Sequence, residues 1–278
     1  MCIRDRIHSD DLIASTEEES MTSYGPETTT DEVLLDHDLT GRHFMITGAS
    51  SGLGEESARA LAQAGATVTM LARNQSKLDK AIERIKSTNP SAVLKTGIAD
   101  LSDQQSIRDY AQGFLATGET IDVLINNAGI SLESLLMRIK DEDWKKIIDT
   151  NLSSAFYLCK AAVSGMMKNR RGRIINIGSV VGSIGAIGNA HYSASKSALL
   201  GFTKSLALEV GSRGITVNNI APGYITTDMT KDIKDELSEA MMDKIPMNRF
   251  GSPEDIAKVA LFLALSLIHN SEPTRRTP

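Results

Sequence analysis

The chain has 278 residues, of which 41% are hydrophobic and 23% charged, and its formal net charge is −5. These values are ordinary for a globular protein, and the acidic balance gives no reason to expect nucleic acid as a partner. No apolar run approaches the ~20 residues of a membrane-spanning helix, and the charged start lacks the apolar segment of a secretory signal. Two cysteines are too few for a disulfide framework, so we expect a cytoplasmic protein.

Both ends of the chain look foreign to a protein fold. A DNA sequence can be written that encodes Met1–Asp5 on one strand. Its complementary strand, read in the opposite direction, encodes Leu-Ser-Leu-Ile-His, which is the sequence of Leu265–His269. We interpret residues 1–6 and 265–278 as translated sequencing adapter, although Asn270 does not fit the extended adapter. The natural chain would then be cut off after the helix expected at 253–264.

Residues 1–37 are acidic and rich in Ser and Thr, which predicts a disordered leader, and residues 38–264 are expected to form a single domain. In that domain, apolar strand-like runs alternate with helical patterns. This alternation predicts a parallel sheet covered on both faces, which is the doubly wound α/β (Rossmann) fold. The expected strands are 44–47, 67–71, 92–95, 121–126, 173–178 and 215–220; the expected helices are 55–64, 75–86, 103–115, 141–150, 152–169, 190–210, 231–243 and 253–264.

A glycine-rich turn, Thr47–Gly54, lies between the first expected strand and the first helix. Such glycines can serve a tight turn alone, but this position is also where a dinucleotide's pyrophosphate meets a helix start. The second strand ends in Ala72-Arg73 without a carboxylate, which favours NADP over NAD, unless Arg73 is an ordinary surface residue. Ser51 and Asn74 could add hydrogen bonds to the phosphate.

Two further polar segments follow later strands. Asp100 comes after the third strand, where it could accept a hydrogen bond from an adenine amino group or cap the next helix. Asn126–Gly129 closes the fourth strand, where a cofactor would cross the sheet. A turn held by side-chain–backbone hydrogen bonds is the alternative for this second segment. The residues alone leave both choices open.

Tyr192 and Lys196 are spaced to share one face at the start of a long helical pattern. Ser179 ends the preceding strand and can reach that face across the loop. A free tyrosine has a pKa near ~10, which a neighbouring ammonium lowers, so the three residues predict a proton-transfer site. Cys159 is expected in the core, and His191 is expected to be only a neighbour of the tyrosine.

Together these segments resemble the short-chain dehydrogenase/reductase family in order and spacing over residues 38–264. The resemblance implies that Tyr192 is the general acid, Lys196 supports it, Ser179 binds the substrate carbonyl and Asn151 holds a water. It implies no metal site. The cofactor residues that it implies are Gly48, Ser50, Ser51, Gly52, Leu53, Gly54, Arg73, Asp100, Leu101, Asn127, Ala128, Gly129, Tyr192, Lys196, Pro222, Gly223, Ile225 and Thr227.

The second half, in segments such as 135–144 and 224–230, resembles the bacterial 3-oxoacyl-[acyl-carrier-protein] reductases of this family. That resemblance implies NADPH-dependent reduction of 3-oxoacyl-[acyl-carrier-protein] to the 3-hydroxyacyl form in fatty-acid biosynthesis, by a homotetramer. Arg170, Arg171 and Arg213 match basic positions that would receive the acidic carrier protein, with solvated helix ends as the alternative.

The first half, at 30–34 and 118–129, resembles the retinol-dehydrogenase-like branch of the family instead. We therefore hypothesise a chimaera with its junction at 126–129. The alternatives for function are another alcohol or ketone reductase acting on retinol- or steroid-like substrates, or a product that only binds cofactor. Because the reductases continue past residue 264 with a seventh strand, we expect six strands, an exposed sheet edge and impaired tetramer assembly.

Overall fold

The computed structural model describes residues 38–227, 242 and 245–265. The leader, the helix expected at 231–243 (Met242 apart) and most of the adapter-like tail lie outside these residues. Within them, six parallel strands form one sheet in the order β3-β2-β1-β4-β5-β6, which confirms the expected doubly wound fold. The strands are β1 (His43–Thr47), β2 (Thr67–Ala72), β3 (Val93–Ile98), β4 (Val123–Asn126), β5 (Gly172–Ile177) and β6 (Ile215–Ile220).

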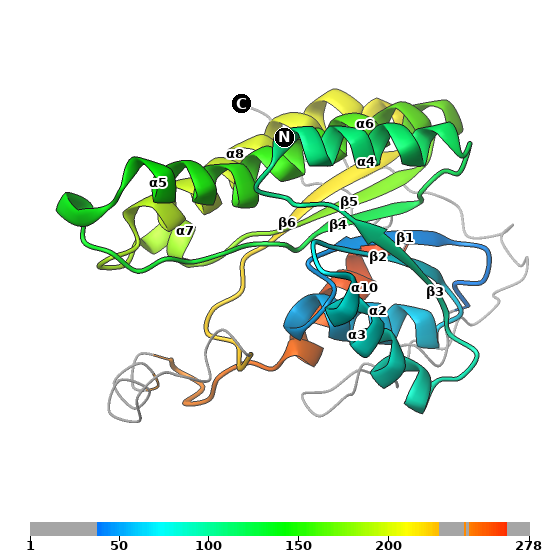
Figure 1. Cartoon of the computed structure of the whole chain (residues 1–278), viewed down its shortest axis with the longest axis horizontal. Coiled ribbons are helices and arrows are strands. Elements are labelled where there is room, and N and C mark those ends of the chain that lie inside the picture. The colour runs from blue at the N-terminus through cyan, green and yellow to red at the C-terminus, as the bar shows by residue number, and fades with distance from the viewer. Residues whose placement is uncertain (1–37, 228–241, 243–244, 266–278) are drawn as a thin grey trace, which may run out of the picture.

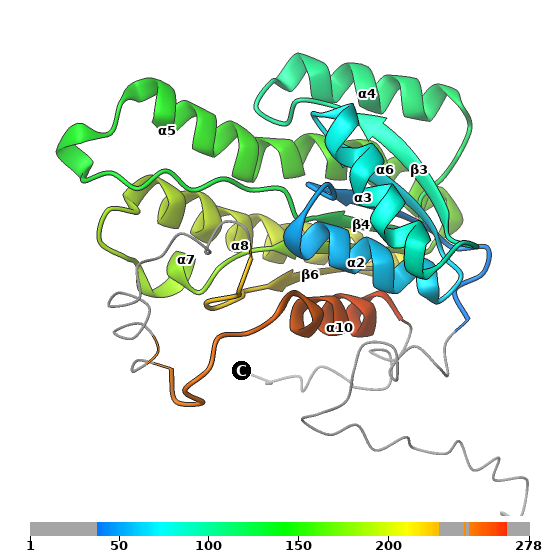
Figure 2. The same ribbon diagram turned by 60° about the horizontal axis from the view of Figure 1, so that its bottom comes forward.

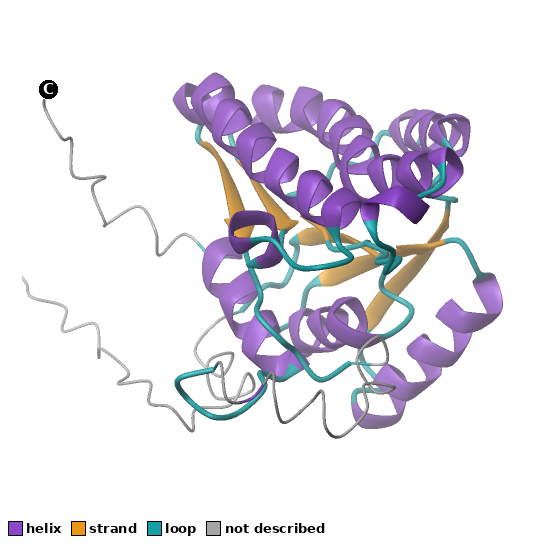
Figure 3. Cartoon of the chain, turned by 90° about the vertical axis from the view of Figure 1, so that its left-hand side faces the viewer, coloured by secondary structure: helices purple, strands orange, loops and turns teal. Residues whose placement is uncertain are grey.

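The helices form a layer on each side of the sheet, as Figures 1, 2 and 3 show. One layer contains α2 (Gly52–Gln63), α3 (Gln75–Thr88) and α10 (Pro253–Ala264), and α10 packs beside α2. The other layer contains α4 (Gln104–Ala116), α6 (Ser154–Asn169) and α8 (Ala190–Val210). Two shorter helices, α5 (Asp141–Ile148) and α7 (Val181–Ile184), lie toward the carboxyl ends of the strands.

Strand β1 shows how the sequence builds two cores. Its side chains alternate between the sheet faces, so Phe44 and Ile46 join the core under α2, α3 and α10, whereas Met45 joins the core under α4, α6 and α8. All five residues of β1 are buried because both faces are covered. This explains why a central strand such as β1 is mostly apolar.

The direction of the strand order reverses between β1 and β4, which pair with each other in the middle of the sheet. Ile46 pairs with Ile125, so the loops that follow the two strands leave the sheet side by side. Ligands of open α/β sheets bind outside the carboxyl ends of the strands at such a switch point. The glycine-rich turn and Asn126–Gly129 are therefore neighbours.

Several boundaries differ from the sequence-based expectation; for example, β3 ends at Ile98 and not at residue 95, and β4 begins at Val123 and not at residue 121. Helix α2 begins at Gly52, so the end of the glycine-rich turn forms the first turn of the helix. The helices expected at 141–150 and 152–169 form one rod, because a π-helical segment, Asp149–Ser153, joins α5 to α6 without interruption. Single π turns inside helices are often found at functional sites, and this one contains Asn151.

The edges of the sheet are β3 and β6, as far as the described residues extend. The six strands agree with the expected number. Among the same residues, no helix is long and apolar enough to cross a membrane.

Candidate active site

A cleft of about 360 Å³ opens at the carboxyl ends of the strands, beside the glycine-rich turn. This volume is within the range of small-molecule sites, roughly 300–1,000 Å³. Most of the residues expected to bind a cofactor line it. They are Gly48, Ser50, Ser51, Gly52, Leu53, Arg73, Asp100, Leu101, Asn127, Ala128, Gly129 and Thr227. Six further residues line it that were not predicted to bind a cofactor: Ala72, Ala99, Ser102, Ile130, Lys146 and Thr150.

Gly54 does not line the cleft but determines how closely its walls approach. A Cβ atom on Gly54 would lie 2.5 Å from the Gly48 carbonyl oxygen and 2.6 Å from Asn127 Nδ2. The same Nδ2 donates to the Thr47 carbonyl at 2.9 Å and to the Gly48 carbonyl at 3.3 Å. The Asn127 side chain thus joins the loop after β4 to the glycine-rich turn, and the residue also lines the cleft.

The start of α2 faces this cleft with its backbone N–H groups available. Ser51 is the N-cap residue, and its side chain makes no capping hydrogen bond. The first N–H groups of any helix lack partners within the helix and favour an anion. Asn74 differs, because its Oδ1 accepts a hydrogen bond from the Lys77 N–H at 2.9 Å and so caps α3. The structure therefore does not bring Asn74 into the cleft lining.

Asp100 forms a tight turn at the far end of the cleft. Its Oδ1 accepts hydrogen bonds from the Ser102 hydroxyl at 2.7 Å and the Ser102 N–H at 2.9 Å. These bonds are the main reason why the pKa of Asp100 is lowered, and the charges of Arg73 and Lys146 lower that pKa further. The residue that caps α4 is Asp103, so the capping alternative for Asp100 is wrong.

Lys196 is the most enclosed charged group near the cleft. Its side chain lies on α8 with only 5% of the residue exposed, and Nζ donates a hydrogen bond to the Ile177 carbonyl at 2.7 Å. Burial lowers the pKa of Lys196 to about 8, because the charged form is poorly solvated there. An ammonium of this kind can release its proton near neutral pH.

Tyr192 and Ser179 lie together beside this lysine. Burial raises the pKa of Tyr192, and a hydrogen bond between the Tyr192 and Ser179 side chains lowers it in part. The net direction is opposite to the one expected from a neighbouring ammonium. The reason is that burial is the largest cause of the shift. Lys196 Nζ lies 5.8 Å from the centre of the tyrosine ring, over its face.

Asn151 connects the π segment to two other parts of the site. Its Oδ1 accepts from the Ile130 N–H at 2.8 Å, and its Nδ2 donates to the Ile130 carbonyl at 3.0 Å and to Ser195 Oγ at 3.1 Å. A Cβ on Gly129 would lie 3.2 Å from Lys196 Nζ and 3.5 Å from Asn151 Oδ1. The asparagine, the lysine and the loop after β4 therefore meet at one point.

Only one of the predicted cofactor residues in the segment Pro222–Thr227 lines the cleft. Thr227 lines the cleft and approaches Gly52, whereas Pro222, Gly223 and Ile225 do not line it. The Pro222 carbonyl instead accepts a hydrogen bond from the Val180 N–H at 3.0 Å, next to Ser179. Tyr192 and Lys196 are also outside the cleft lining. Their proposed contacts with a cofactor stay predictions.

The arginines expected to receive a carrier protein lie at the amino ends of the strands, opposite the cleft. Arg170 and Arg171 precede β5, Arg213 precedes β6, and Arg170 Nη2 donates to the Ser212 carbonyl at 3.2 Å. The structure thus brings them close together. However, the six residues of β5 separate them from Ser179, and a strand of that length spans about 20 Å.

No group of three His, Cys, Asp or Glu side chains that could hold a metal ion occurs in the part of the chain that the structure describes. Cys159 is buried in the core, and burial raises its pKa to about 12. A thiol with such a pKa stays protonated and unreactive at neutral pH.

Comparison with known proteins agrees with this geometry. Residues 42–238 match the short chain dehydrogenase family, so the chain belongs to that family of NAD(P)-using oxidoreductases. It is 43% identical to a 3-oxoacyl-[acyl-carrier-protein] reductase of Vibrio cholerae over 226 residues, which are 81% of this chain and 91% of the relative. The corresponding reductase of Escherichia coli K12 is 44% identical over 81% of this chain and 90% of the relative.

Solved structures show the same likeness. A 3-oxoacyl-[acyl-carrier protein] reductase from Brucella melitensis superposes with a TM-score of 0.81 and 31% identity, over 88% of this chain and 92% of that one. A putative NAD(P)-dependent gluconate 5-dehydrogenase from Beutenbergia cavernae, solved with bound NADP at low occupancy, gives 0.79 and 33%, over 83% and 92%. The same fold therefore occurs in relatives described with different substrates.

The alignments also bear on the chimaera hypothesis. An aligned stretch of 226 residues is longer than the chain on either side of 126–129, which has 125 residues before it and 149 (278 − 129) after it. The likeness to the reductases therefore crosses the hypothetical junction. Whether the first half is nearer to the retinol-dehydrogenase-like branch stays a prediction.

Proposed function

We propose that this chain reduces 3-oxoacyl thioesters on acyl carrier protein to 3-hydroxyacyl thioesters, with NADPH as the reductant. The observation that carries the proposal is the arrangement of Ser179, Tyr192 and Lys196 beside the cleft, with a buried lysine whose pKa is about 8. The relatives named above support the choice of substrate, because reductases of that name match most of the chain at 43–44% identity.

The residues of the cleft fit a nicotinamide dinucleotide. Gly54 allows the first turn of α2 to approach the loop after β4, and an added Cβ would fill that space. The N-terminus of α2 suits a pyrophosphate, and Arg73 lines the cleft where the ribose next to adenine would lie. No carboxylate follows β2 at this point, and the adjacent Asn74 caps α3. These features favour the 2′-phosphorylated cofactor.

When bound, the cofactor supplies a hydride to the carbonyl carbon of the substrate. The Tyr192 hydroxyl would give its proton to the carbonyl oxygen as negative charge develops there. The Ser179 hydroxyl, which already hydrogen-bonds the tyrosine, would hold the same oxygen and stabilise that charge. These two side chains thus divide proton transfer and orientation between them.

Lys196 would then restore the proton of the tyrosine. Its ammonium is held by the Ile177 carbonyl, and its low pKa places proton release within reach of neutral pH. Asn151 meets the lysine above Gly129, and we propose that its carboxamide keeps a water there to carry the proton onward. The hydrogen bonds of Asn151 to Ile130 and Ser195 fix its position for that role.

Turnover of a substrate series tests the proposal. We expect the full chain to oxidise NADPH in the presence of acetoacetyl-[acyl-carrier protein], and to act poorly on retinol- and steroid-like alcohols or ketones. Activity on a bulky lipid alcohol without turnover of the acetoacetyl thioester would contradict the proposal and support the alternative substrate class. Homotetramer assembly and cytoplasmic localisation stay predictions.

A further inference from the structure

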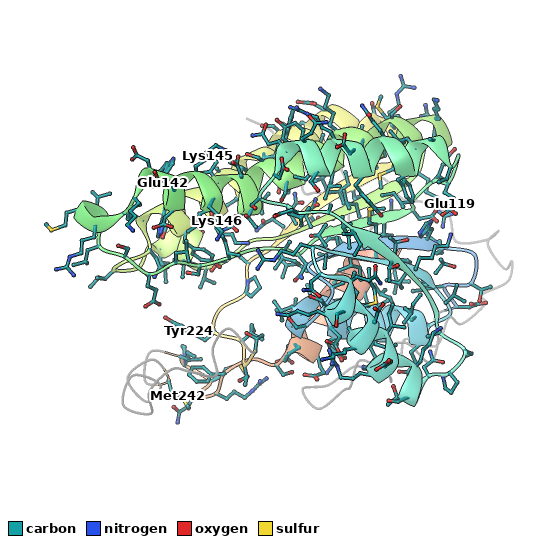
Figure 4. The ribbon with its side chains drawn as sticks, in the orientation of Figure 1. Glu119, Glu142, Lys145, Lys146, Tyr224 and Met242 are labelled. Atoms are coloured by element: carbon teal, nitrogen blue, oxygen red, sulfur yellow. The ribbon has the colours of Figure 1, made fainter. Side chains whose placement is uncertain are left out.

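Lys146 on α5 lines the cofactor cleft, although no sequence motif marks it. In Figure 4, Lys145 lies on the upper side of α5 and Lys146 on its lower side, toward the strands. Their roles differ. Lys145 forms an ion pair with Asp149, which fixes it along the helix, whereas Lys146 belongs to the wall of the cleft.

The charges around Asp100 place Lys146 at a particular end of this cleft. The positive charges of Arg73 and Lys146 both lower the pKa of the Asp100 carboxyl. Arg73 follows β2 and Lys146 comes from α5, so cations from two separate elements act on one carboxylate. That carboxylate is also held by Ser102. Both cations therefore act at the same end of the cleft.

This end of the cleft would receive the adenosine part of the cofactor. The pyrophosphate belongs at the N-terminus of α2, after β1, and the residues after β2 and β3 lie further along the same edge of the sheet. Arg73 and Asp100 are those residues. A lysine that lines the cleft and whose charge acts on Asp100 is therefore near the adenine and its ribose.

We propose that Lys146 is a specificity residue for the 2′-phosphate of the cofactor and acts as a second cation with Arg73. The inference rests on the proposed use of NADPH. A lysine suits the task because its flexible aliphatic stem can cover an adenine ring while the ammonium reaches toward a phosphate. Arg73 can bind the phosphate in a fixed planar geometry, whereas Lys146 adds charge from the opposite wall.

The size of the effect follows from exposure. Lys146 is exposed to solvent, so water and salt screen its charge. A phosphate monoester carries about −1.5 to −2 charges at neutral pH, which strengthens the attraction relative to a carboxylate. We expect loss of the Lys146 charge to weaken binding of 2′-phosphorylated ligands about three- to fivefold, because an exposed ion pair is worth about 1 kcal/mol at most.

Calorimetric titration of the full chain tests this without any substrate. The ligands are NADPH, NADH, 2′,5′-ADP and 5′-AMP, each at low and high salt. The variant is Lys146→Gln, with Lys146→Arg as the conservative form. Lys204→Gln is the matched control, because Lys204 is an exposed lysine of α8 outside the cleft lining. Lys145 is unsuitable as a control because it pairs with Asp149.

The expected result is weaker binding of NADPH and 2′,5′-ADP by Lys146→Gln, with changes below about twofold for NADH and 5′-AMP. Lys146→Arg and Lys204→Gln should bind like the wild type, and the difference should shrink at high salt. Equal weakening for all four ligands, or none, would overturn the role of Lys146 while wild-type preference for NADPH stands. If the wild type itself shows no preference for NADPH, the proposed cofactor fails together with this inference.

Discussion

At the carboxyl edge of the sheet, the nearly buried Lys196 has a backbone carbonyl and a tyrosine ring as its neighbours, and burial alone lowers its pKa. At the amino edge, His43 is only 9% exposed but has a partner for each ring nitrogen. Nδ1–H donates to the Thr120 carbonyl at 3.1 Å, and Nε2 accepts from the Thr69 hydroxyl at 2.8 Å.

The acidic and basic groups around His43 are also paired. The backbone N–H of His43 donates to the Asp122 carboxylate at 2.9 Å. Lys95 forms an ion pair with Glu119 at 2.8 Å. In Figure 4, Glu119 lies at the end of the sheet away from Lys146. The comparison teaches that every nitrogen of His43 has a partner, whereas Lys196 has a single backbone partner and a pKa lowered by burial.

The largest effect should follow from closing the space beside the glycine-rich turn. Gly54→Ala places a Cβ 2.5 Å from the Gly48 carbonyl oxygen, so the loop or the helix must move. We expect NADPH affinity to fall more than about 100-fold, since a displaced backbone loses several phosphate hydrogen bonds. Calorimetric titration measures it.

The matched control is Gly113→Ala on α4, where an added Cβ meets nothing within 4 Å. It should leave NADPH binding unchanged and stabilise the fold by about 0.5–1 kcal/mol. Unaltered NADPH affinity in Gly54→Ala would show that the close approach is not needed for the cofactor.

Replacing the buried lysine should stabilise the protein while removing its activity. The pKa of Lys196 is about 8 in the fold and 10.5 in an unfolded chain, so below pH 8 the folded protein must bury an ammonium. We expect Lys196→Met to raise the free energy of unfolding by about 1–3 kcal/mol at pH 7, less than the full shift because the Ile177 carbonyl loses its donor.

The sign of the pH dependence is part of this prediction. The wild type should gain stability as pH rises from 8 to 10.5, because the unfolded chain binds more protons in that window. The advantage of Lys196→Met should therefore be full below pH 8 and absent near pH 10.5. Chemical denaturation at several pH values measures it, and a variant that is less stable than the wild type at pH 7 would contradict the account of Lys196.

A charge reversal at the amino edge tests the carrier-protein proposal. Arg170→Glu combined with Arg213→Glu should raise KM for acetoacetyl-[acyl-carrier protein] about tenfold, because like charges then face an acidic partner. KM for a small acetoacetyl thioester without the carrier should not change. Equal effects on both substrates, or none, would show that the carrier docks elsewhere, as the distance of these arginines from Ser179 allows.

The smallest effect concerns His43. Burial and the Lys95 charge lower its pKa, so protonation disfavours the fold and stability should fall as pH drops below about 6.5. We expect His43→Gln to reduce that loss between pH 6.5 and 5.5 by up to about 1 kcal/mol. Thermal unfolding across this range measures it, and an identical pH profile in variant and wild type would contradict the assignment.

The sequence was sufficient for elements whose boundaries depend on local signals. Strand β6 and helices α8 and α10 occur at the residues expected, and α10 begins with a capping box between Ser252 and Asp255. The π segment was not predicted because one extra residue in a turn hardly changes the helical pattern. Its consequence, a continuous rod through Asn151, depends on packing between α5, α6 and α8.

Side-chain roles at the site were harder to predict than the positions of the motifs. Asn74 and Asp100 both follow strands that end at the cleft, but Asn74 bonds to its own helix, and Asp103 makes the cap that was one of two alternatives for Asp100. These choices are decided by local backbone geometry. Lys146 was missed because only the folded chain brings α5 next to the residues after β2 and β3.

His191 is a second buried histidine, next to Tyr192 on α8. It is fully buried, and neither ring nitrogen has a hydrogen-bond partner among the described residues. Sequence predicted no role for it beyond its position next to Tyr192. A buried polar group without a partner normally costs stability, so its environment differs from that of the well-partnered His43.

The central claim is that Tyr192 transfers the proton in an NADPH-dependent reduction. Its most direct test is Tyr192→Phe in the full chain, which removes the hydroxyl and keeps the ring. We predict that kcat for acetoacetyl-[acyl-carrier protein] falls at least about 100-fold, while the Kd for NADPH changes less than about twofold. A variant that retains a substantial part of wild-type kcat, with unchanged NADPH binding, would contradict the account.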